Sequence, residues 1–441
     1  MVNWEKVRVS QFLKEREGRY RPNDEAVRSL KRLDKIDFSG NVYLTDKDSK
    51  TDMIIIKPGD LVISGINVSK GAIAVYYGEE PITATIHYSS YVFDNNQVDI
   101  NYFKRFIKSQ SFVQALKDQV KGGIKTEIKP KHLLQLEILL PDINRQKEIV
   151  SFFNSIENEI DSISNKNNQQ QSFINKLRQQ VLQEAIEGKL TAEWRREHPE
   201  LISGENHASK LLEKIKVEKE QLIKEGKIKK ERPLVAITDD EKPFELPDGW
   251  VWCRLGEISN FIDYRGKTPT KTTSGIRLIT AKNVKKGSLS LEPEEFISEA
   301  EYQQRMTRGF PQNGDIFFTT EAPLGNVCLN VLTEKISVGQ RVITIHPLMI
   351  DSKLLMYQLL SKRIQSEINN RRSGITAEGI KSSRFRLIPI PVPPLAEQRA
   401  IVNEVSELIA MIDELEKQVS ERKGQSGMMM QSVMREAFAT S

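Results

Sequence analysis

The sequence has few of the residues on which secreted, metal-binding or membrane proteins depend. Its 441 residues include two cysteines, Cys253 and Cys328, and five histidines that are not grouped at metal-ligand spacing. Two distant cysteines build neither a disulfide framework nor a zinc site. No signal peptide opens the chain, and no apolar run approaches the ~20 residues that cross a bilayer. We therefore expect a cytoplasmic protein with reduced core cysteines, no metal site and no membrane partner.

The common catalytic motifs are also missing. The chain contains no G-x-x-x-x-G-K-[ST] phosphate loop, no G-x-S-x-G nucleophile elbow and no Asn-Pro-Pro or Asp-Pro-Pro tetrapeptide of the amino-methyltransferase type. The stretch "EIKPK" (127–131) has the Glu-x-Lys spacing of some nucleases, but no acidic partner is suitably placed upstream. We expect a protein without catalytic residues and without a cofactor of its own.

Charge of one sign does not dominate the chain. Lys and Arg number 65 against 60 Asp and Glu, so the formal net charge is +5. This balance permits a polyanionic partner without requiring one. The length corresponds to two or three domains.

An internal repeat decides the architecture. "PDINRQKEIV" (141–150) and "PPLAEQRAIV" (393–402) share a proline, a glutamine and a closing Ile-Val when one is shifted by 252 residues onto the other. The same shift, without a gap, matches Asp161 with Asp413, Val181 with Val433 and Ala185 with Ala437. We infer that the chain arose by duplication.

Both copies continue from this motif with an apolar repeat of 3.5 residues, which is typical of a coiled-coil seam. In the first copy the seam residues are Ile149, Phe153, Ile156, Ile160, Ile163, Ile174, Leu177 and Val181, with Asn167 and Gln170 between Ile163 and Ile174. In the second they are Ile401, Val405, Leu408, Ile412, Leu415 and Val419. Each helix should run about 45 residues, or roughly 65 Å. We expect the two helices to pair antiparallel.

A mixed α/β globule of about 140 residues should precede each helix. Trp4 and Trp252 open comparable strands, and "PGDLVIS" (58–64) and "NGDIFFT" (313–319) each place a Gly-Asp turn before a strand. The fold class is therefore α+β, with two globules separated by two long helices in a pseudo-twofold internal repeat. The predicted domains are globule 1 (1–141), helix 1 (142–190), a linker with an amphipathic helix (191–245), globule 2 (246–393) and helix 2 (394–441).

The linker ends in the basic run "KIKK" (227–230). Two interpretations remain open for this run: a solvated linker, which is the commoner use of such sequences, or a nucleic-acid patch.

These motifs together resemble the specificity (S) subunit of type I restriction-modification systems. The resemblance covers essentially the whole chain and rests on "PPLAEQRAIV", "SGITAEGIKSSRFRLIPIPV", "LRQQVLQEAIEGKLTAEWRREHP" and "FELPDGWVWCRLGEI". One departure is that Asn144 and Arg145 stand where the second copy has Ala396 and Glu397.

The resemblance implies that each globule is a target recognition domain for one part of a split double-stranded DNA sequence. It implies that the helices dock two modification (M) subunits, which bind S-adenosylmethionine and methylate adenine. Restriction (R) subunits, with ATP and Mg²⁺, would join through them. The chain itself would be non-catalytic.

Phosphate contacts need Lys, Arg or small hydroxyls, and base edges favour Arg, Lys, Asn and Gln. The DNA-binding candidates of globule 1 are Arg16, Arg19, Arg21, Ser64, Asn67, Lys70 and Lys125. Those of globule 2 are Tyr264, Arg265, Lys267, Lys282, Asn283, Thr320, Glu321, Gln340, Arg341 and Thr376.

Three other interpretations stay open at the level of sequence. The same architecture would serve a specificity subunit of a combined nuclease-methyltransferase system of the type IIG or IIB kind. A coiled-coil scaffold that binds only proteins is a second alternative, and a nuclease with an unrecognised site is a third.

Overall fold

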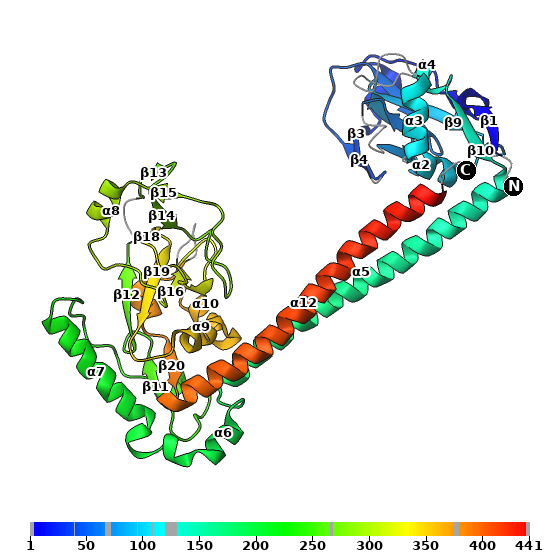
Figure 1. Cartoon of the computed structure of the whole chain (residues 1–441). Coiled ribbons are helices and arrows are strands. Elements are labelled where there is room, and N and C mark those ends of the chain that lie inside the picture. Colours follow the sequence, from blue (N-terminus) through cyan, green and yellow to red (C-terminus); the bar gives the residue numbers. More distant parts are fainter. Residues whose placement is uncertain are drawn as a thin grey trace. The chain divides into compact units, whose positions relative to one another are not determined.

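The computed structural model describes residues 4–38, 40–66, 72–94, 96–107, 109–119, 130–264, 268–373 and 379–437. The chain forms two compact units, the first comprising Met1–Asn168 and Ser420–Ser441 and the second Gln169–Val419. Each unit holds one α/β globule together with part of both long helices (Figure 1).

The globule of the first unit contains two four-stranded sheets. One is antiparallel, in the order β2 (Leu13–Glu15), β9 (Tyr88–Phe93), β6 (Leu61–Ser64) and β7 (Ile73–Val75). The other is mixed, in the order β4 (Val42–Thr45), β3 (Arg32–Ile36), β8 (Ile82–Thr85) and β5 (Met53–Ile56). Its helices are α1 (Glu25–Arg28), α2 (Ile100–Phe106), α3 (Gln110–Gln119) and α4 (Pro130–Leu133).

The globule of the second unit repeats this plan. Its antiparallel sheet has the order β12 (Ser259–Asp263), β19 (Val342–Pro347), β16 (Ile316–Thr319) and β17 (Val327–Leu329). The mixed sheet has the order β13 (Lys271–Thr272), β15 (Phe296–Ile297), β14 (Ile276–Ile279) and β18 (Ile336–Val338). The helices are α8 (Glu299–Arg305), α9 (Ser352–Leu360), α10 (Lys362–Asn370) and α11 (Ser382–Phe385). The antiparallel sheets share their strand order, and three strands of the mixed sheets correspond, β4-β3-β8 to β15-β14-β18, whereas the fourth strand lies at opposite edges. This common framework confirms the predicted duplication.

A two-stranded ribbon joins the beginning and the end of each globule. In the first unit β1 (Trp4–Arg8) pairs with β10 (Glu137–Pro141), and in the second β11 (Val251–Arg254) pairs with β20 (Pro389–Val392). Trp4 lies opposite Pro141, whereas Trp252 lies opposite Pro391, two residues before the matching Pro393. The prediction that Trp252 corresponds to Trp4 is therefore wrong, because the ribbon register makes Trp250 the counterpart.

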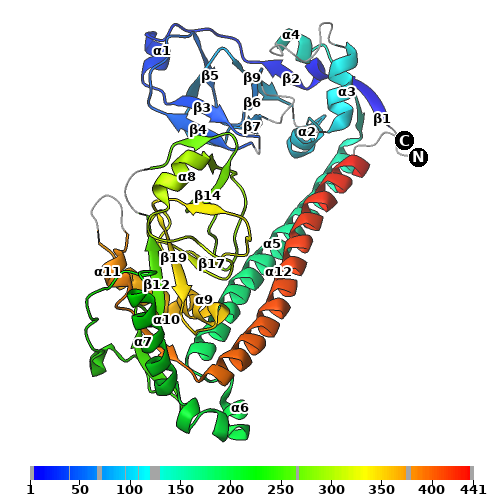
Figure 2. The same ribbon diagram turned by 60° about the vertical axis from the view of Figure 1, so that its left-hand side comes forward.

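The second unit has a continuous core from its sheet to its long helices. Ile316 on β16, Leu355 on α9 and Ile401 at the start of the last helix are fully buried in one cluster. Figure 2 shows α9 beside the long helices. Cys253 and Cys328 are also buried, as predicted. Burial raises the pKa of the Cys253 thiol well above its ordinary value and that of Cys328 to about 12, so both thiols stay protonated and act as apolar side chains.

The two long helices are α5 (Ile143–Ile186) and α12 (Leu395–Ala437), and they pair antiparallel as predicted. In the second unit, Gln171 donates to Glu416 at 2.7 Å, and Arg178 contacts both Glu416 and Asp413 at 2.8 Å. In the first unit, Val433 packs against the cluster that contains Ile149 and Phe153. Early residues of α5 thus meet late residues of α12.

Most of the predicted seam is buried, but three positions are wrong. Ile149, Phe153, Ile174, Val181, Ile401, Val405, Ile412 and Val419 are buried, and Ile156, Ile160 and Leu408 are partly buried. Ile163, Leu177 and Leu415 are 38%, 45% and 46% exposed. A straight helix of 3.6 residues per turn drifts away from a strict 3.5-residue repeat, so these positions turn outward while Asn167 becomes buried.

The repeated glutamine ties each long helix to its globule. In the first unit, Gln146 accepts a hydrogen bond from the backbone N–H of Asp99 at 2.8 Å and donates to the carbonyl of Pro141 at 2.8 Å. In the second, Gln398 makes the same two bonds with Asp351 and Pro393, at 2.9 and 3.1 Å. Asp99 and Asp351 cap helices α2 and α9. The glutamine is therefore the joint between globule and helix.

The neighbouring position is used differently in the two copies. Glu397 is fully buried and accepts hydrogen bonds from Thr191, Arg195 and Trp250 at 2.6, 2.5 and 2.7 Å. It therefore fastens the linker to the start of α12. Its counterpart, Arg145, is exposed and pairs with Glu148.

The linker contains α6 (Ala192–Glu197) and α7 (Ala208–Lys224), and α7 is the predicted amphipathic helix, with Leu211 and Ile215 buried. Among the described helices, none has the length and apolarity required to cross a membrane.

Candidate nucleic-acid interface

In the second globule, the residues chosen from the sequence gather at one end of the antiparallel sheet. Strand β12 ends at Asp263 opposite Ile343, and β16 ends at Thr319 opposite Val342, the first residue of β19. The segments that follow β12 and β16 and the segment that precedes β19 therefore leave the sheet at the same edge. Loops at one end of a rigid sheet are a common place for binding residues.

Direct contacts connect these segments. Thr268 donates to the side chain of Gln340 at 3.2 Å. Arg341 forms an ion pair with Glu321 at 2.8 Å, and the backbone N–H of Thr320 donates to the carbonyl of Arg341 at 3.0 Å. The structure brings the candidates Gln340, Arg341 and Glu321 to this end of the sheet, and all three are at least partly exposed.

The loop after β14 lies at the same end. Asn326 in the β16–β17 hairpin donates to the carbonyl of Val284 at 2.9 Å, and the N–H of Gly287 donates to that of Val327 at 2.8 Å. Lys282 is exposed here, beside exposed Lys285 and Lys286. The two latter lysines were missed, although the run "KNVKKG" (282–287) carries a basic signal.

Three candidates of the second globule have structural roles instead. Asn283 is buried and donates to the carbonyls of Ser290 and Pro293 at 3.0 and 3.1 Å. Thr320 is buried, and the buried Tyr264 donates its hydroxyl to the carbonyl of Gly309. We correct the prediction for Asn283, Thr320 and Tyr264, because a buried polar group that is already hydrogen-bonded does not reach a base edge.

The first globule has the equivalent end. Ser64 closes β6 opposite Tyr88, the first residue of β9. The segment after β2 carries Arg19 and Arg21, which are both exposed. Ser64 itself is buried within the sheet, so its prediction as a DNA contact is wrong.

Arg16 is also a framework residue, because it is bound to the buried Asp60. Its Nε and Nη2 lie 2.6 and 2.7 Å from the two carboxylate oxygens. Burial acts to raise the pKa of Asp60, but hydrogen bonds from Arg16, Lys57 and Ser90 outweigh it, so that the pKa is lowered. The prediction of Arg16 as a DNA contact is therefore corrected.

Asp60 and its counterpart Asp315 both follow a glycine in the turn that precedes the third strand of the antiparallel sheet. Gly59 and Gly314 have φ of 87° and 88°, a conformation that favours glycine. Asp315, the counterpart of Asp60, is buried and lies 2.6 Å from Nδ1 of His346, whose pKa that contact raises. The two aspartates hold a common framework on which the exposed loops differ.

Six candidates, Asn67, Lys70, Lys125, Arg265, Lys267 and Thr376, lie outside the described residues. Within the described part of the chain, no three His, Cys, Asp or Glu side chains are grouped closely enough to hold a metal ion.

The chain is similar to several curated proteins. It is 32% identical over 272 residues to the Type I restriction enzyme EcoEI specificity subunit of Escherichia coli, covering 56% of this chain and 42% of that protein. It is 29% identical over 343 residues to the EcoAI specificity subunit of Escherichia coli, covering 74% and 55%. The chain thus spans about half the length of these two relatives. The MjaVIII specificity subunit of Methanocaldococcus jannaschii is 22% identical over 431 residues, covering 93% and 87%.

Solved structures share the fold. A chain described in work on complex assembly and conformational transition of the type I R-M system superposes with a TM-score of 0.65 at 16% identity, covering 99% of this chain and 98% of that one. The HsdS subunit from Thermoanaerobacter tengcongensis gives 0.52 at 15% identity, covering 99% and 96%. The family model described as "Type I restriction modification DNA specificity domain" matches residues 1–170 and 247–422. With four-fifths of its length matched in two stretches that coincide with the two copies, the chain belongs to the type I restriction-modification DNA specificity family.

Proposed function

We propose that this chain reads a bipartite double-stranded DNA target, one part with each globule, as the specificity subunit of a type I restriction-modification complex. The observation that carries the proposal is the matching end of the two antiparallel sheets. In both sheets the strand that leads to this end, β6 or β16, starts from the same Gly-Asp turn, yet the exposed side chains at the end itself differ. A shared framework with divergent loops suits two readers of different half-sites.

The exposed residues have the chemistry that DNA recognition needs. Arg19 and Arg21 in the first globule, and Lys282, Gln340 and Arg341 in the second, can contact phosphates or the acceptor edges of bases. Arg341 is paired with Glu321 at 2.8 Å. The pair holds the guanidinium in place, and Glu321 can itself accept from cytosine N4.

The long helices carry apolar side chains that stay exposed to solvent after the two helices have paired. In the second unit these are Phe173 and Leu177 on α5 and Met411 and Leu415 on α12, between 45% and 64% exposed. They lie near the level where Arg178 contacts Asp413. Exposed apolar residues of this size mark protein interaction sites. We assign this surface to methyltransferase (M) subunits, which would bring S-adenosylmethionine and, in turn, restriction (R) subunits.

In this proposal the chain supplies the DNA address and performs no chemistry, and it works in the cytoplasm as part of the assembled complex. Adenine methylation and ATP-driven cleavage belong to the partner subunits.

Exchange of residues 1–141 for the corresponding domain of another family member tests the proposal. The exchange should change one half of the methylated target and leave the other half intact, as read by methylome sequencing of cells that carry the assembled system. Methylation at a target altered in both halves would contradict the assignment of one half-site to each globule. A complex that binds target and scrambled duplexes equally would contradict DNA reading itself.

A further inference from the structure

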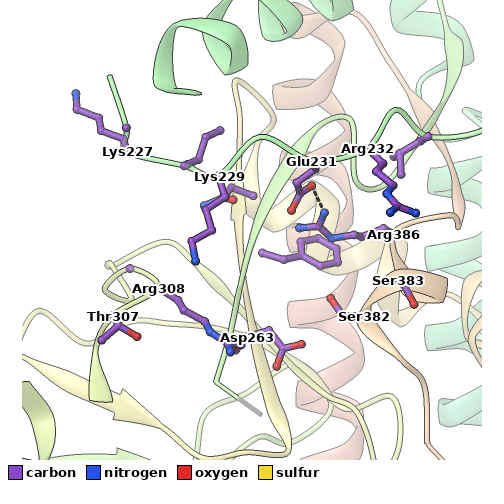
Figure 3. Close-up of a pocket in the computed structure, with 16 residues that line it drawn as sticks. Lys227, Lys229, Glu231, Arg232, Asp263, Thr307, Arg308, Ser382, Ser383 and Arg386 are labelled. Atoms are coloured by element: carbon purple, nitrogen blue, oxygen red, sulfur yellow. Dashed lines mark hydrogen bonds and ion pairs between the residues drawn. The ribbon is translucent and has the colours of Figure 1, made fainter. Parts of the chain in front are cut away.

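The second unit contains a hollow of about 630 Å³ that no part of the candidate interface uses. Its walls are the end of the linker, the outer side of β12, the residues after α8 and the short helix α11 (Figure 3). Strand β12 is an edge strand of its sheet, so the hollow follows a side of the sheet that no other strand covers.

Cations dominate the lining. Lys227, Lys229, Arg232, Arg308 and Arg386 face only two acidic residues, Glu231 and Asp263. Arg386 is paired with Glu231 and lies over the ring of Phe261, 4.9 Å from its centroid. Because Arg386 and Glu231 neutralise each other, neither contributes to the net charge of the hollow.

Lys227 is paired with Glu225 at 2.8 Å, which leaves Lys229, Arg232 and Arg308 as the cations of the hollow without an acidic partner among the described residues. Arg308 donates to the backbone carbonyl of Asp263, a bond that leaves its charge uncompensated. Lys229 extends into the hollow, whereas Lys227 points away from it (Figure 3).

The half-buried Lys219 beside the hollow is affected by the same positive charge. Its ammonium donates to the carbonyls of Gly256 and Ser259 at 2.5 and 3.2 Å. Burial first, and then the charge of Arg386, lower the pKa of Lys219 to about 8. Neutral donors complete the lining, with the hydroxyl groups of Ser382 and Ser383 and the amide of Asn260. Lys, Arg, Ser and Asn together form a typical set of ligands for a phosphate group.

The hollow adjoins the DNA-reading end. Asp263 is the last residue of β12 and belongs to both. The next residue, Tyr264, donates to the carbonyl of Gly309 and accepts from the N–H of Arg308 at 3.1 Å. A duplex held by the loops at that end therefore has a route for its backbone along the edge of β12.

We propose that Lys229 and Arg232 of the linker, with Arg308, form a phosphate clamp that holds the sugar–phosphate backbone next to the half-site of the second globule. This inference rests on the proposed function and deepens it. It assigns the basic run of the linker to nucleic acid rather than to solvent, and it gives the linker a role in affinity but none in base reading.

The test compares Lys229→Gln/Arg232→Gln with Lys216→Gln/Lys230→Gln, a control that removes the same charge from exposed residues outside the hollow. Each full-length variant is assembled with its methyltransferase subunits, and its affinity for target and scrambled duplexes is measured over a range of salt concentrations. Each lost phosphate contact lowers the slope of log affinity against log salt by about 0.9. The clamp variant should lose about two units of slope and roughly tenfold or more in affinity at low salt, equally for both duplexes.

Several outcomes overturn the clamp. One is a clamp variant whose slope of log affinity against log salt equals that of the wild type. Another is a control variant that loses as much slope as the clamp variant, since that would show a general effect of net charge. Loss of methyltransferase binding with an unchanged DNA slope would assign the hollow to an acidic protein segment. Inorganic phosphate that replaces chloride at equal ionic strength should weaken DNA binding of the wild type but not of the clamp variant, and an equal effect on both proteins would contradict the clamp. The same titrations give the ratio of wild-type affinities for target and scrambled duplexes. A ratio of one would contradict sequence reading, whereas an unchanged salt slope in the clamp variant would contradict the clamp alone.

Discussion

Equivalent residues of the two copies have different structural roles, and an arginine in the two-stranded ribbon is one example. The ribbon register matches Arg8 with Arg254. Arg8 is half exposed and contacts Glu137 at 3.3 Å. Arg254 is buried and donates to Glu241 at 2.6 and 2.7 Å and to the carbonyls of Val235, Ala236 and Leu387. It fixes the last part of the linker against the second globule.

Arg254→Met should therefore lower the free energy of unfolding of the second unit by about 3 to 5 kcal/mol, because it leaves the carboxylate of Glu241 and three carbonyls without their donor. Arg8→Met is the matched control and should cost at most about 1 kcal/mol. Urea unfolding followed by tryptophan fluorescence measures both, since Trp4 belongs to the first unit with Arg8, and Trp194, Trp250 and Trp252 belong to the second unit with Arg254. Equal midpoints for the two variants would contradict the assigned role of Arg254.

The same pair predicts a pH dependence. The hydrogen bond from Arg254 is the largest of the effects that lower the pKa of Glu241, from 4.5 to about 2. A folded-state pKa below the unfolded value stabilises the protein above about pH 5, and this stabilisation is lost as the pH falls from 4.5 towards 2. Glu241→Gln should be less stable than wild type at pH 7 and should approach it near pH 2. A constant difference between the two proteins over that range would refute the linkage.

Residue types alone predicted only part of the site. Arg341 and Lys282 are exposed, so they stay predicted DNA contacts, whereas Asn283, Thr320 and Ser64 are buried within the fold. Side-chain chemistry defines what a residue is able to bind, but burial decides whether it meets a ligand. The repeated glutamine shows the same limit, because its two partners become apparent only when Asp99 and Asp351 are placed beside it.

At the scale of elements, the apolar period predicted the existence and length of the long helices, and the duplication predicted their antiparallel pairing. It did not predict which positions leave the seam. That depends on how a straight helix drifts across its partner and on the ends of α5 and α12, where the globules also cover the helices. Ile412 and Leu415 illustrate the difference, since both fit the 3.5-residue repeat but only Ile412 is buried.

Ile412→Asp should cost several kcal/mol, because it places an unpaired carboxylate in an apolar core. Leu415→Asp serves as its control and should leave the unfolding midpoint almost unchanged while weakening capture of methyltransferase subunits. Urea unfolding and a pull-down with tagged methyltransferase separate the two effects. A Leu415→Asp variant that unfolds early would return this residue to the seam, and one that captures the partner normally would remove it from the docking surface.

At the scale of the whole molecule, we expect the paired helices to set the distance between the two half-sites. Seven residues inserted after Ile163 and after Leu415 preserve the heptad and lengthen each helix by about 10.5 Å, or roughly three base pairs of DNA. Three pairs also turn the duplex by about 100°. Binding to the native spacer should fall strongly, with partial recovery at most on a spacer about three pairs longer, since DNA distortion costs several kcal/mol.

Competition binding of the assembled complex against duplexes with graded spacers measures this effect. A single insertion is the internal control, because it shifts one helix against the other and should bind less well than the double insertion. An unchanged preference of the doubly lengthened protein for the original spacer would show that the helices do not set the distance.

The ribbons β1–β10 and β11–β20 have a consequence for the history of the gene. Each ribbon pairs the first and last strands of a globule at the start of a long helix. The two ends of the globule's chain segment therefore lie next to each other. Two crossovers, one at each side of such a segment, would transplant a complete recognition domain without touching the helices. The new domain has to fit the ribbon, the glutamine bonds and the buried surface that the globule shares with the start of the long helix. If each globule reads one half-site as proposed, such an exchange would give the chain a new target in one step rather than by gradual mutation.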